Sequence, residues 1–233
     1  MQYVLHIANK NYSSWSLRPW VLMKALGIPF EEVLHVFPAD GPSYPLFRQF
    51  SPTGLVPVLV DGDTRVWESL SIVGYLAERH DDIWPEEPHA RAWARSAACE
   101  MHAGFYGLRN TCSMNCGIRV QMPEIGERLQ RDLARLDELW GEGLSRFGGP
   151  FLGGDRFTAV DAFFCPVAFR VQSYAPPLAE QSLAYVQRLL AMPAMSEWYA
   201  AALEEPYREP AHEAEARAAG ALTADYRARP AQS

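Results

Sequence analysis

The sequence has few cysteines, no long apolar run and no excess of basic residues. No uncharged apolar stretch approaches the ~20 residues needed to cross a bilayer, and residues 1–7 lack the basic region of a signal peptide. We therefore expect a cytoplasmic protein without a membrane partner. The four cysteines, Cys99, Cys112, Cys116 and Cys165, are too scattered for the disulfide framework of a small secreted domain, so we expect them to be reduced. The 21 basic residues are outnumbered by 28 acidic ones, and a net charge of −7 argues against nucleic acid as a partner.

What is present describes an ordinary globular chain with two parts. With 233 residues and 48 % apolar residues, the chain suits one large or two small domains with a sizeable core. A stretch with linker composition, residues 80–88, holds Pro85 and Pro88 and predicts a boundary near residue 85. We divide the chain into residues 1–80, residues 88–210 and a tail, 211–233. The tail has little apolar content from His212 onward, so we expect it to follow the surface or to be partly disordered.

The spacing of apolar residues differs between the two parts. In the first part it predicts strands over 3–7 and 31–36, a hairpin over 56–67, a helix from Trp15 or Ser16 to Gly27 and a helix opening at Ser69. This order predicts a small α/β unit with a mixed sheet, which resembles the thioredoxin-like fold. The second part has helical spacing throughout, so we predict an all-α domain with helices over 90–109, 124–147, 159–174, 178–190 and 194–203.

Four short motifs, taken together, indicate a family resemblance. They are the run 12–18 (YSSWSLR), the Val56-Pro57 pair, the Glu68-Ser69 pair and the run 157–161 (FTAVD). In this order and spacing the chain resembles the cytosolic glutathione transferase superfamily along nearly its whole length. The resemblance implies glutathione as co-substrate, a small hydrophobic electrophile as the other partner, and a homodimer.

The serine run is closest to the signature of the zeta class, in which the first serine is catalytic. That residue is Ser13 here, with Ser14 as the next candidate. A hydroxyl beside a helix N-terminus stabilises a thiolate, and lowering a thiol pKa of ~8.5 by about two units requires about 2.7 kcal/mol. The alternative is that these serines are loop and cap residues. Trp15 stands where the zeta class has a cysteine, so cysteine-dependent chemistry of that class is not expected.

The resemblance assigns glutathione binding to Trp15, Leu55, Val56, Pro57, Glu68 and Ser69. It implies a cis peptide bond before Pro57, with the backbone of the preceding residue facing the cysteinyl group of glutathione. Leu55 differs from the polar residue usual in zeta enzymes. The hydroxyl and free N–H groups at Ser69 would receive the γ-glutamyl carboxylate, and Glu68 its ammonium group. An ordinary serine cap after a solvated glutamate explains this pair equally well.

In the second part, the resemblance places Tyr106 and Arg109 at the electrophile pocket, together with Met114 and Asn115; packing or exposure is the alternative for each. The run Thr158 to Asp161 fits a capping box and is assigned to folding. Other side chains carry weaker signals. We expect a structural salt bridge at Arg18, and no metal site, because Cys112, Cys116 and His102 match no zinc-binding spacing.

Together these features predict an enzyme that activates glutathione with a serine hydroxyl and conjugates or isomerises a small electrophile. An isomerase of the maleylacetoacetate type is one form of this activity. A non-catalytic module that binds ligands or proteins through the same fold is the alternative. A thiol-disulfide exchanger is disfavoured because the first part has no cysteine.

Overall fold

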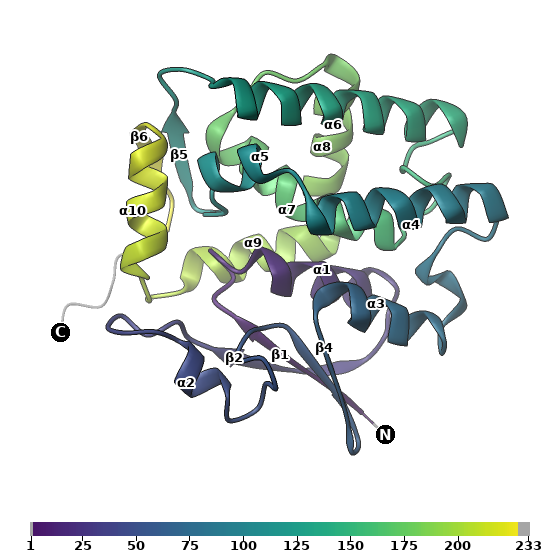
Figure 1. Ribbon diagram of the computed structural model, residues 1–233, viewed down its shortest axis with the longest axis horizontal. Coiled ribbons are helices and arrows are strands. Elements are labelled where there is room, and N and C mark those ends of the chain that lie inside the picture. Colours follow the sequence, from purple (N-terminus) through teal and green to yellow (C-terminus); the bar gives the residue numbers. More distant parts are fainter. Residues whose placement is uncertain (1, 228–233) are drawn as a thin grey trace.

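The computed structural model describes residues 2–227 and consists of a small mixed sheet with flanking helices, followed by a larger helical part (Figure 1). The first part comprises β1 (Tyr3–Ala8), α1 (Ser14–Ala25), β2 (Phe30–His35), α2 (Tyr44–Phe47), β3 (Val58–Asp61), β4 (Thr64–Trp67) and α3 (Ser69–Ala77). The second part comprises a 3-10 turn η1 (Asp81–Ile83), α4 (Pro88–Ala103), α5 (Tyr106–Thr111), β5 (Ile118–Gln121), α6 (Glu127–Arg146), α7 (Ala159–Tyr174), α8 (Glu180–Leu190), α9 (Pro193–Glu204), α10 (Pro210–Ala219) and β6 (Ala221–Asp225). The predicted fold class, a thioredoxin-like unit followed by a helical domain, is confirmed.

The sheet has the strand order β2-β1-β3-β4, with β1 parallel to β2 and the other neighbours antiparallel. Side chains alternate between its faces, as strand geometry requires. Leu5 and Ile7 of β1 are fully buried in the core, whereas His6 between them bonds to His35 across the strand pair. One face is covered by α1 and α3, which lie between the sheet and the helical part, and α2 lies on the other side (Figure 1).

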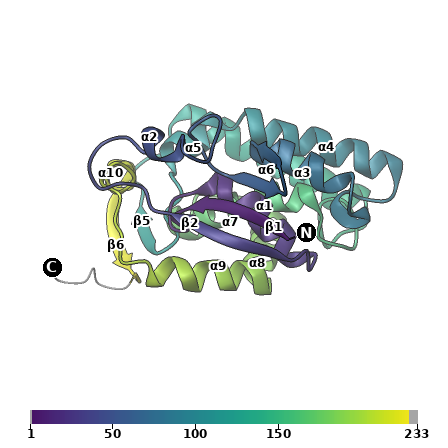
Figure 2. The ribbon, with the colours of Figure 1, turned by 90° about the horizontal axis from the view of Figure 1, so that it is seen from below.

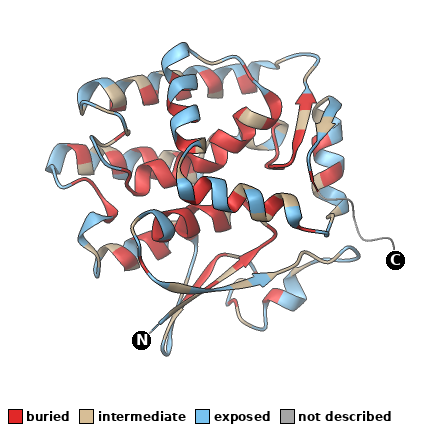
Figure 3. Cartoon of the chain, turned by 180° about the vertical axis from the view of Figure 1, so that it is seen from behind, coloured by how far each residue is buried: buried red, intermediate tan, exposed pale blue. Residues whose placement is uncertain are grey.

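The two parts meet where α1 packs on α7 and α9. Seen from below, the strands β1 and β2 lie over α1 and α7 (Figure 2). Every residue of α7 except Gln172 is buried, so this helix is the centre of the helical part. By contrast, α6 is buried along one face only, and buried and exposed residues alternate along it (Figure 3).

The predicted capping box starts α7. Asp161 accepts hydrogen bonds from the N–H of Thr158, the N–H of Leu152 and the hydroxyl of Tyr185, at 3.0, 3.0 and 2.8 Å. The reciprocal Thr158 and Asp161 contacts are both present. This motif is therefore a structural element that joins α7 to α8 and to the preceding loop.

Two features of the helical part differ from the prediction. The helix expected over 90–109 is broken, because the backbone of Gly104 is extended, with φ −130° and ψ −155°, and Phe105 has a left-handed φ of 56°. The second feature is a two-stranded antiparallel sheet formed by β5 and β6. β5 lies between two of the predicted helices, and four residues are too short a run for the period of apolar residues to identify a strand.

Part of the tail has regular secondary structure, which the sequence did not predict. Residues 210–225 form α10 and β6 at one end of the molecule, beside β5 (Figure 1). A composition rich in charge predicts poor burial, but Glu213 and Arg227 satisfy each other and are both only 9 % exposed. Residues 228–233 of the predicted tail lie outside the described residues. We keep the division into residues 1–80 and 88–210 as a proposal. Among the helices within residues 2–227, none combines the length and apolar character needed to cross a bilayer.

Candidate functional site

The loop that carries the two candidate serines is anchored by the end of α9. The backbone N–H groups of Lys10 and Asn11 donate to the carboxylate of Glu205 at 2.6 and 3.3 Å. The carbonyl of Lys10 accepts from the indole of Trp198 at 2.8 Å. Burial raises the pKa of Glu205, and the two N–H donors oppose this rise. No local pattern pointed to Glu205, since its partners lie in the other part of the chain.

Ser13 is the N-cap residue of α1, but its side chain makes no capping bond. Its Oγ donates instead to Oγ of Ser16 at 2.7 Å, and the same Ser16 oxygen accepts the backbone N–H of Ala8 at 3.2 Å. The hydroxyl of Ser13 therefore does not act as an ordinary helix cap. Both Ser13 and Ser14 are largely buried, with 5 % and 8 % of their surface exposed.

Trp15 lies beside the serines and is surrounded by positive charge. The guanidinium carbons of Arg18 and Arg109 lie over its ring, 4.1 and 4.5 Å from the ring centre, and His102 contacts the ring edge-on at 5.1 Å. The salt bridge expected at Arg18 is wrong: within residues 2–227 this side chain has no ion pair, and it donates to Ser69 Oγ at 3.5 Å. The guanidinium of Arg18 is stabilised by the rings of Trp15 and Phe163 and by the hydroxyl of Ser69.

The peptide bond between Val56 and Pro57 is cis, as predicted. Val56 and the half-exposed Leu55 line a hollow of about 270 Å³ together with Ser13, Ser14 and Trp15. Thus five of the eight residues assigned to catalysis and glutathione binding share one hollow. Pro57 is buried and is not among the residues that line it.

Glu68 and Ser69 lie at the start of α3, outside this hollow. Ser69 is fully buried, and Arg18 connects it to Trp15. Glu68 is exposed and has a positive φ of 68°. A non-glycine residue held in this region costs about 1–3 kcal/mol, a strain that tends to gather at ligand sites.

The two predicted electrophile contacts separate in the structure. Arg109 lines the hollow, is half-buried and donates to the carbonyl of His102 at 3.2 Å. Tyr106 is 63 % exposed and does not line the hollow. Met114 lines it, and Asn115 is buried and donates to Glu213 at 3.0 Å.

One wall of the hollow comes from α10, which sequence reasoning missed. The ring of His212 stacks on Tyr12 and Phe37, with centres 5.0 and 5.4 Å apart, and all three line the hollow. Nδ1 of His212 lies 2.7 Å from a carboxylate oxygen of Glu209. The turn residues and alanines of this segment carry no periodic signal that would have placed it here.

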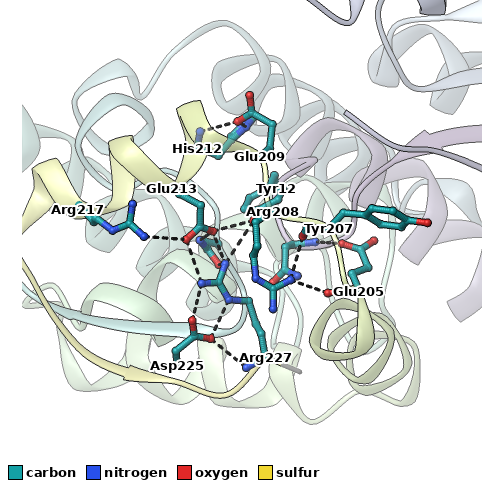
Figure 4. A network of polar contacts seen from close by, with 12 residues as sticks. Tyr12, Glu205, Tyr207, Arg208, Glu209, His212, Glu213, Arg217, Asp225 and Arg227 are labelled. Atoms are coloured by element: carbon teal, nitrogen blue, oxygen red, sulfur yellow. Dashed lines mark hydrogen bonds and ion pairs between the residues drawn. The ribbon is translucent and has the colours of Figure 1, made fainter. Parts of the chain in front are cut away.

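A buried charge network ties α10 and β6 to the serine loop (Figure 4). Glu213 accepts from Arg227, from the hydroxyl of Tyr12 at 2.7 Å and from Asn115. Arg227 also pairs with Asp225 at 2.6 Å. The C-terminal segment is therefore bonded to the residue next to Ser13.

This network also determines which hydroxyls are available in the hollow. Burial and the bond to Glu213 raise the pKa of Tyr12, so its proton stays on the oxygen and is directed to that carboxylate. Ser13 and Ser14 are the next two hydroxyl-bearing residues along the chain, and both line the hollow.

Two cysteines of the helical part have the opposite character from a reactive thiol. Cys112 and Cys116 are fully buried, and burial raises the pKa of Cys112 to about 12 and that of Cys116 further. Within residues 2–227 no group of three or more His, Cys, Asp or Glu side chains is arranged to hold a metal ion.

A second, larger hollow lies elsewhere. It has a volume of about 1610 Å³ and lies between the start of α4 and the loop from α6 to α7, with Trp84, Pro85 and Gly153 among its walls. None of the predicted site residues lines it.

Comparison with known proteins identifies relatives of both parts of the chain. Two family models match, the glutathione S-transferase N-terminal domain over residues 12–79 and the C-terminal domain over residues 119–201. A zeta class glutathione S-transferase of Euphorbia esula is 28 % identical over 66 % of this chain and 70 % of its own. A maleylacetoacetate isomerase of Rhizobium meliloti is 29 % identical over 72 % of this chain and 81 % of its own.

A solved structure extends the comparison to the fold. The theta class glutathione S-transferase of Xanthomonas axonopodis pv. citri, with glutathione bound, has a TM-score of 0.62 and 25 % identity, covering 84 % of this chain and 96 % of that one. Since both domain models match in the expected order and together span more than half of the residues, the chain belongs to the glutathione S-transferase superfamily.

Proposed function

We propose that this protein is a glutathione transferase in which the Ser13 hydroxyl stabilises the thiolate of glutathione for attack on a small electrophile. The observation that carries the proposal is the position of Ser13: it lines the hollow at the N-terminus of α1, and its hydroxyl is free of any capping bond. The helix terminus adds a partial positive charge at the same place.

A chain of hydrogen bonds from Ala8 through Ser16 would polarise the Ser13 hydroxyl. The N–H of Ala8 donates to Ser16, and Ser16 is bonded to Ser13. When a thiolate arrives, the Ser13 proton turns to the sulfur, and the Ser16 hydroxyl can donate to the oxygen of Ser13 in its place. Because hydrogen bonds in a chain strengthen one another, this arrangement favours the ionised thiol. The thiol proton itself leaves to solvent.

The rest of glutathione is assigned by the resemblance. The backbone of Val56 would face the cysteinyl group, with Trp15, Leu55 and Pro57 beside it. Ser69 and the free N–H groups of α3 would receive the γ-glutamyl carboxylate, and Glu68 its ammonium group. The buried position of Ser69 and the strained backbone of Glu68 support this half of the proposal.

Calorimetric titration with glutathione in buffers of different ionisation enthalpy tests the proposal, since proton release on binding reports thiolate formation. We expect release from the wild type and its loss in Ser13→Ala. A hydrogen bond to a charged group contributes about 1.5–3 kcal/mol, so turnover with an aryl halide should fall about 10- to 100-fold.

The matched control is Ser14→Ala, which removes the neighbouring hydroxyl from the same hollow. If Ser14→Ala abolishes proton release and Ser13→Ala does not, the catalytic role passes to Ser14. If neither variant changes the release or the rate, serine activation is wrong.

Two other outcomes define the alternatives. Turnover of maleylacetone with the double bond isomerised and no stable thioether formed would favour the isomerase, which the likeness to the Rhizobium enzyme makes worth assaying. Glutathione binding without reaction of any electrophile would favour the non-catalytic module.

The resemblance also implies a homodimer, for which sedimentation should give about twice the chain mass of 26.2 kDa.

A further inference from the structure

Three arginines from three helices gather around the hollow. Arg18 comes from α1, Arg109 from α5 and Arg170 from α7. Arg109 and Arg170 line the hollow itself, and Arg18 shares the ring of Trp15 with Arg109. The positive charges of Arg109 and Arg170 add to burial in lowering the pKa of Arg18.

Arg170 is the most unusual of the three. It is only 5 % exposed, and one of its guanidinium nitrogens donates to the carbonyl of Cys112. Its Nε is buried and makes no hydrogen bond. Within residues 2–227 neither Arg170 nor Arg109 has a carboxylate partner in ion-pair range. Buried charges in proteins are ordinarily paired with a charge of opposite sign. The buried guanidinium of Arg170 lacks such a partner, so an anion bound in the hollow would complete the pairing.

The acidic side chains near the cluster do not fill this role. Glu68 acts on Arg18 through space but is exposed at the start of α3. Glu215 lines the hollow from α10, and its side chain is also exposed. Two arginines and one exposed glutamate therefore line the hollow, and its charged side chains sum to a net positive charge.

The remaining walls limit what the anion can be. Phe37, Phe47, Met114 and Leu55 supply the apolar part of the wall beside polar side chains, and the hollow holds about 270 Å³. An arginine fork matches the geometry of a carboxylate. A small molecule with an apolar body and one carboxylate fits both the charge and the walls, and it would lie in the same hollow as Ser13.

We propose that the electrophile is a small organic acid, whose carboxylate is held by Arg109 and Arg170 while its reactive carbon faces the thiolate at Ser13. This inference rests on the proposed function and narrows its substrate class. The two arginines bind and orient the acid, and they take no part in bond making.

The test compares two aryl chlorides of similar shape, the anionic 4-chloro-3-nitrobenzoate and the neutral 4-chloro-3-nitrobenzamide. In each, the sulfur of glutathione forms a bond to the ring carbon that carries chlorine, chloride leaves with the bonding electrons, and the thiol proton goes to solvent. Because the amide makes the ring intrinsically more reactive, each kcat/KM is divided by the rate constant of the uncatalysed reaction with glutathione. We expect this normalised kcat/KM of the wild type to be higher for the benzoate. In Arg109→Met this preference should fall about tenfold or more, the loss typical of one charged hydrogen bond, with the KM for glutathione unchanged.

Arg170→Met risks misfolding because Arg170 supports the carbonyl of Cys112, so Arg170→Lys is measured beside it; Lys keeps the charge but loses the fork, and we expect a smaller loss of preference. The control is Arg131→Met, which removes an exposed arginine of α6 and should leave the preference unchanged.

Direct binding separates this inference from the proposed function. Calorimetry with the unreactive pair 3-nitrobenzoate and 3-nitrobenzamide measures the anion site without chemistry. If neither chloride reacts but 3-nitrobenzoate binds in an Arg109-dependent manner, the transferase proposal fails and the anion site stands.

If both chlorides react equally in the wild type and in Arg109→Met, the anion site is overturned and the transferase proposal stands. A rise in the KM for glutathione alone would assign the arginines to glutathione and overturn the inference.

Discussion

Two neighbouring residues, Tyr12 and Ser13, place hydroxyl groups at the same hollow, and the direction of each proton distinguishes them. The proton of Tyr12 is directed to Glu213, away from the ligand space. The proton of Ser13 lies toward another hydroxyl, Ser16, which can donate as well as accept. At the scale of one residue, only the second arrangement can be reversed when a thiolate binds.

Ser16→Ala tests this relay. The change removes the partner of Ser13 but leaves Ser13 in place, so the bound thiol should ionise less readily. We expect the apparent pKa in the pH–rate profile to rise and kcat/KM near neutral pH to fall about 3- to 10-fold, the effect of about one ordinary hydrogen bond.

The control is Ser96→Ala, at an exposed serine of α4 whose hydroxyl donates to the carbonyl of Ala92. A fall in thermal stability with an unchanged pH profile would show that Ser16 is merely structural, since it also accepts the N–H of Ala8.

At this scale the sequence predicted residues in local motifs and missed those brought in from far along the chain. Ser13, Val56 and Arg109 were predicted and line one hollow. Glu205 and Arg170 were not, because a lone glutamate in a loop and an arginine within an apolar helix have no local pattern that marks their partners. Their roles depend on the packing of α7 and α9 against α1.

At the scale of elements, α10 and β6 are the largest departure from what the sequence predicted. Periodicity identifies segments that bury apolar residues, but this segment is held by buried ions instead. The pKa of Glu213 is lowered, because hydrogen bonds from Arg227 and Tyr12 outweigh the opposing effect of burial. A composition argument counts such residues as solvated and so predicts a tail.

Arg227→Met should therefore destabilise the molecule from its C-terminal end. Removing one partner of a buried ion pair leaves the other charge uncompensated, and we expect the free energy of unfolding to fall by about 3 kcal/mol in urea titrations. Hydrogen exchange should speed up first in α10, which is tied to the core through this network (Figure 4).

Arg217→Met provides the matched control, because its exposed guanidinium is 3.9 Å from the same Glu213 carboxylate. This change should cost less than about 0.5 kcal/mol, as is usual for a surface pair. Equal losses in the two variants would show that the network contributes no more than a surface ion pair.

At the scale of the whole molecule, the buried helix α7 forms the centre of the helical part, and the sequence predicted it with its bounds, 159–174. The capping box marked its start, and a run of apolar residues predicted its length. What could not be predicted is that Asp161 would also bond to Leu152 and Tyr185, so that one carboxylate joins three segments of the helical part. This concentration of contacts makes Asp161 a probe of global stability.

Asp161 should give the protein a measurable pH dependence of stability. Burial raises its pKa to about 6, above the ordinary 3.8, and its four hydrogen bonds only partly oppose this. The folded state therefore binds the proton more tightly than the unfolded state. The stabilisation from this proton is complete below the unfolded-state pKa and is lost as the pH rises through the folded-state value.

Asp161→Asn lacks this titration, so the comparison isolates it from all other carboxylates. The wild type should lose about 2–3 kcal/mol relative to the variant between about pH 4 and pH 7, since one pKa unit corresponds to about 1.4 kcal/mol. Asp155→Asn, which removes the charge of a side chain that is 90 % exposed, should follow the wild type in parallel at every pH. A constant difference between wild type and Asp161→Asn would mean that the carboxylate titrates alike in both states. In that case the bonds to Leu152, Thr158 and Tyr185 fully offset burial, and α7 is held by an ordinary ionised cap.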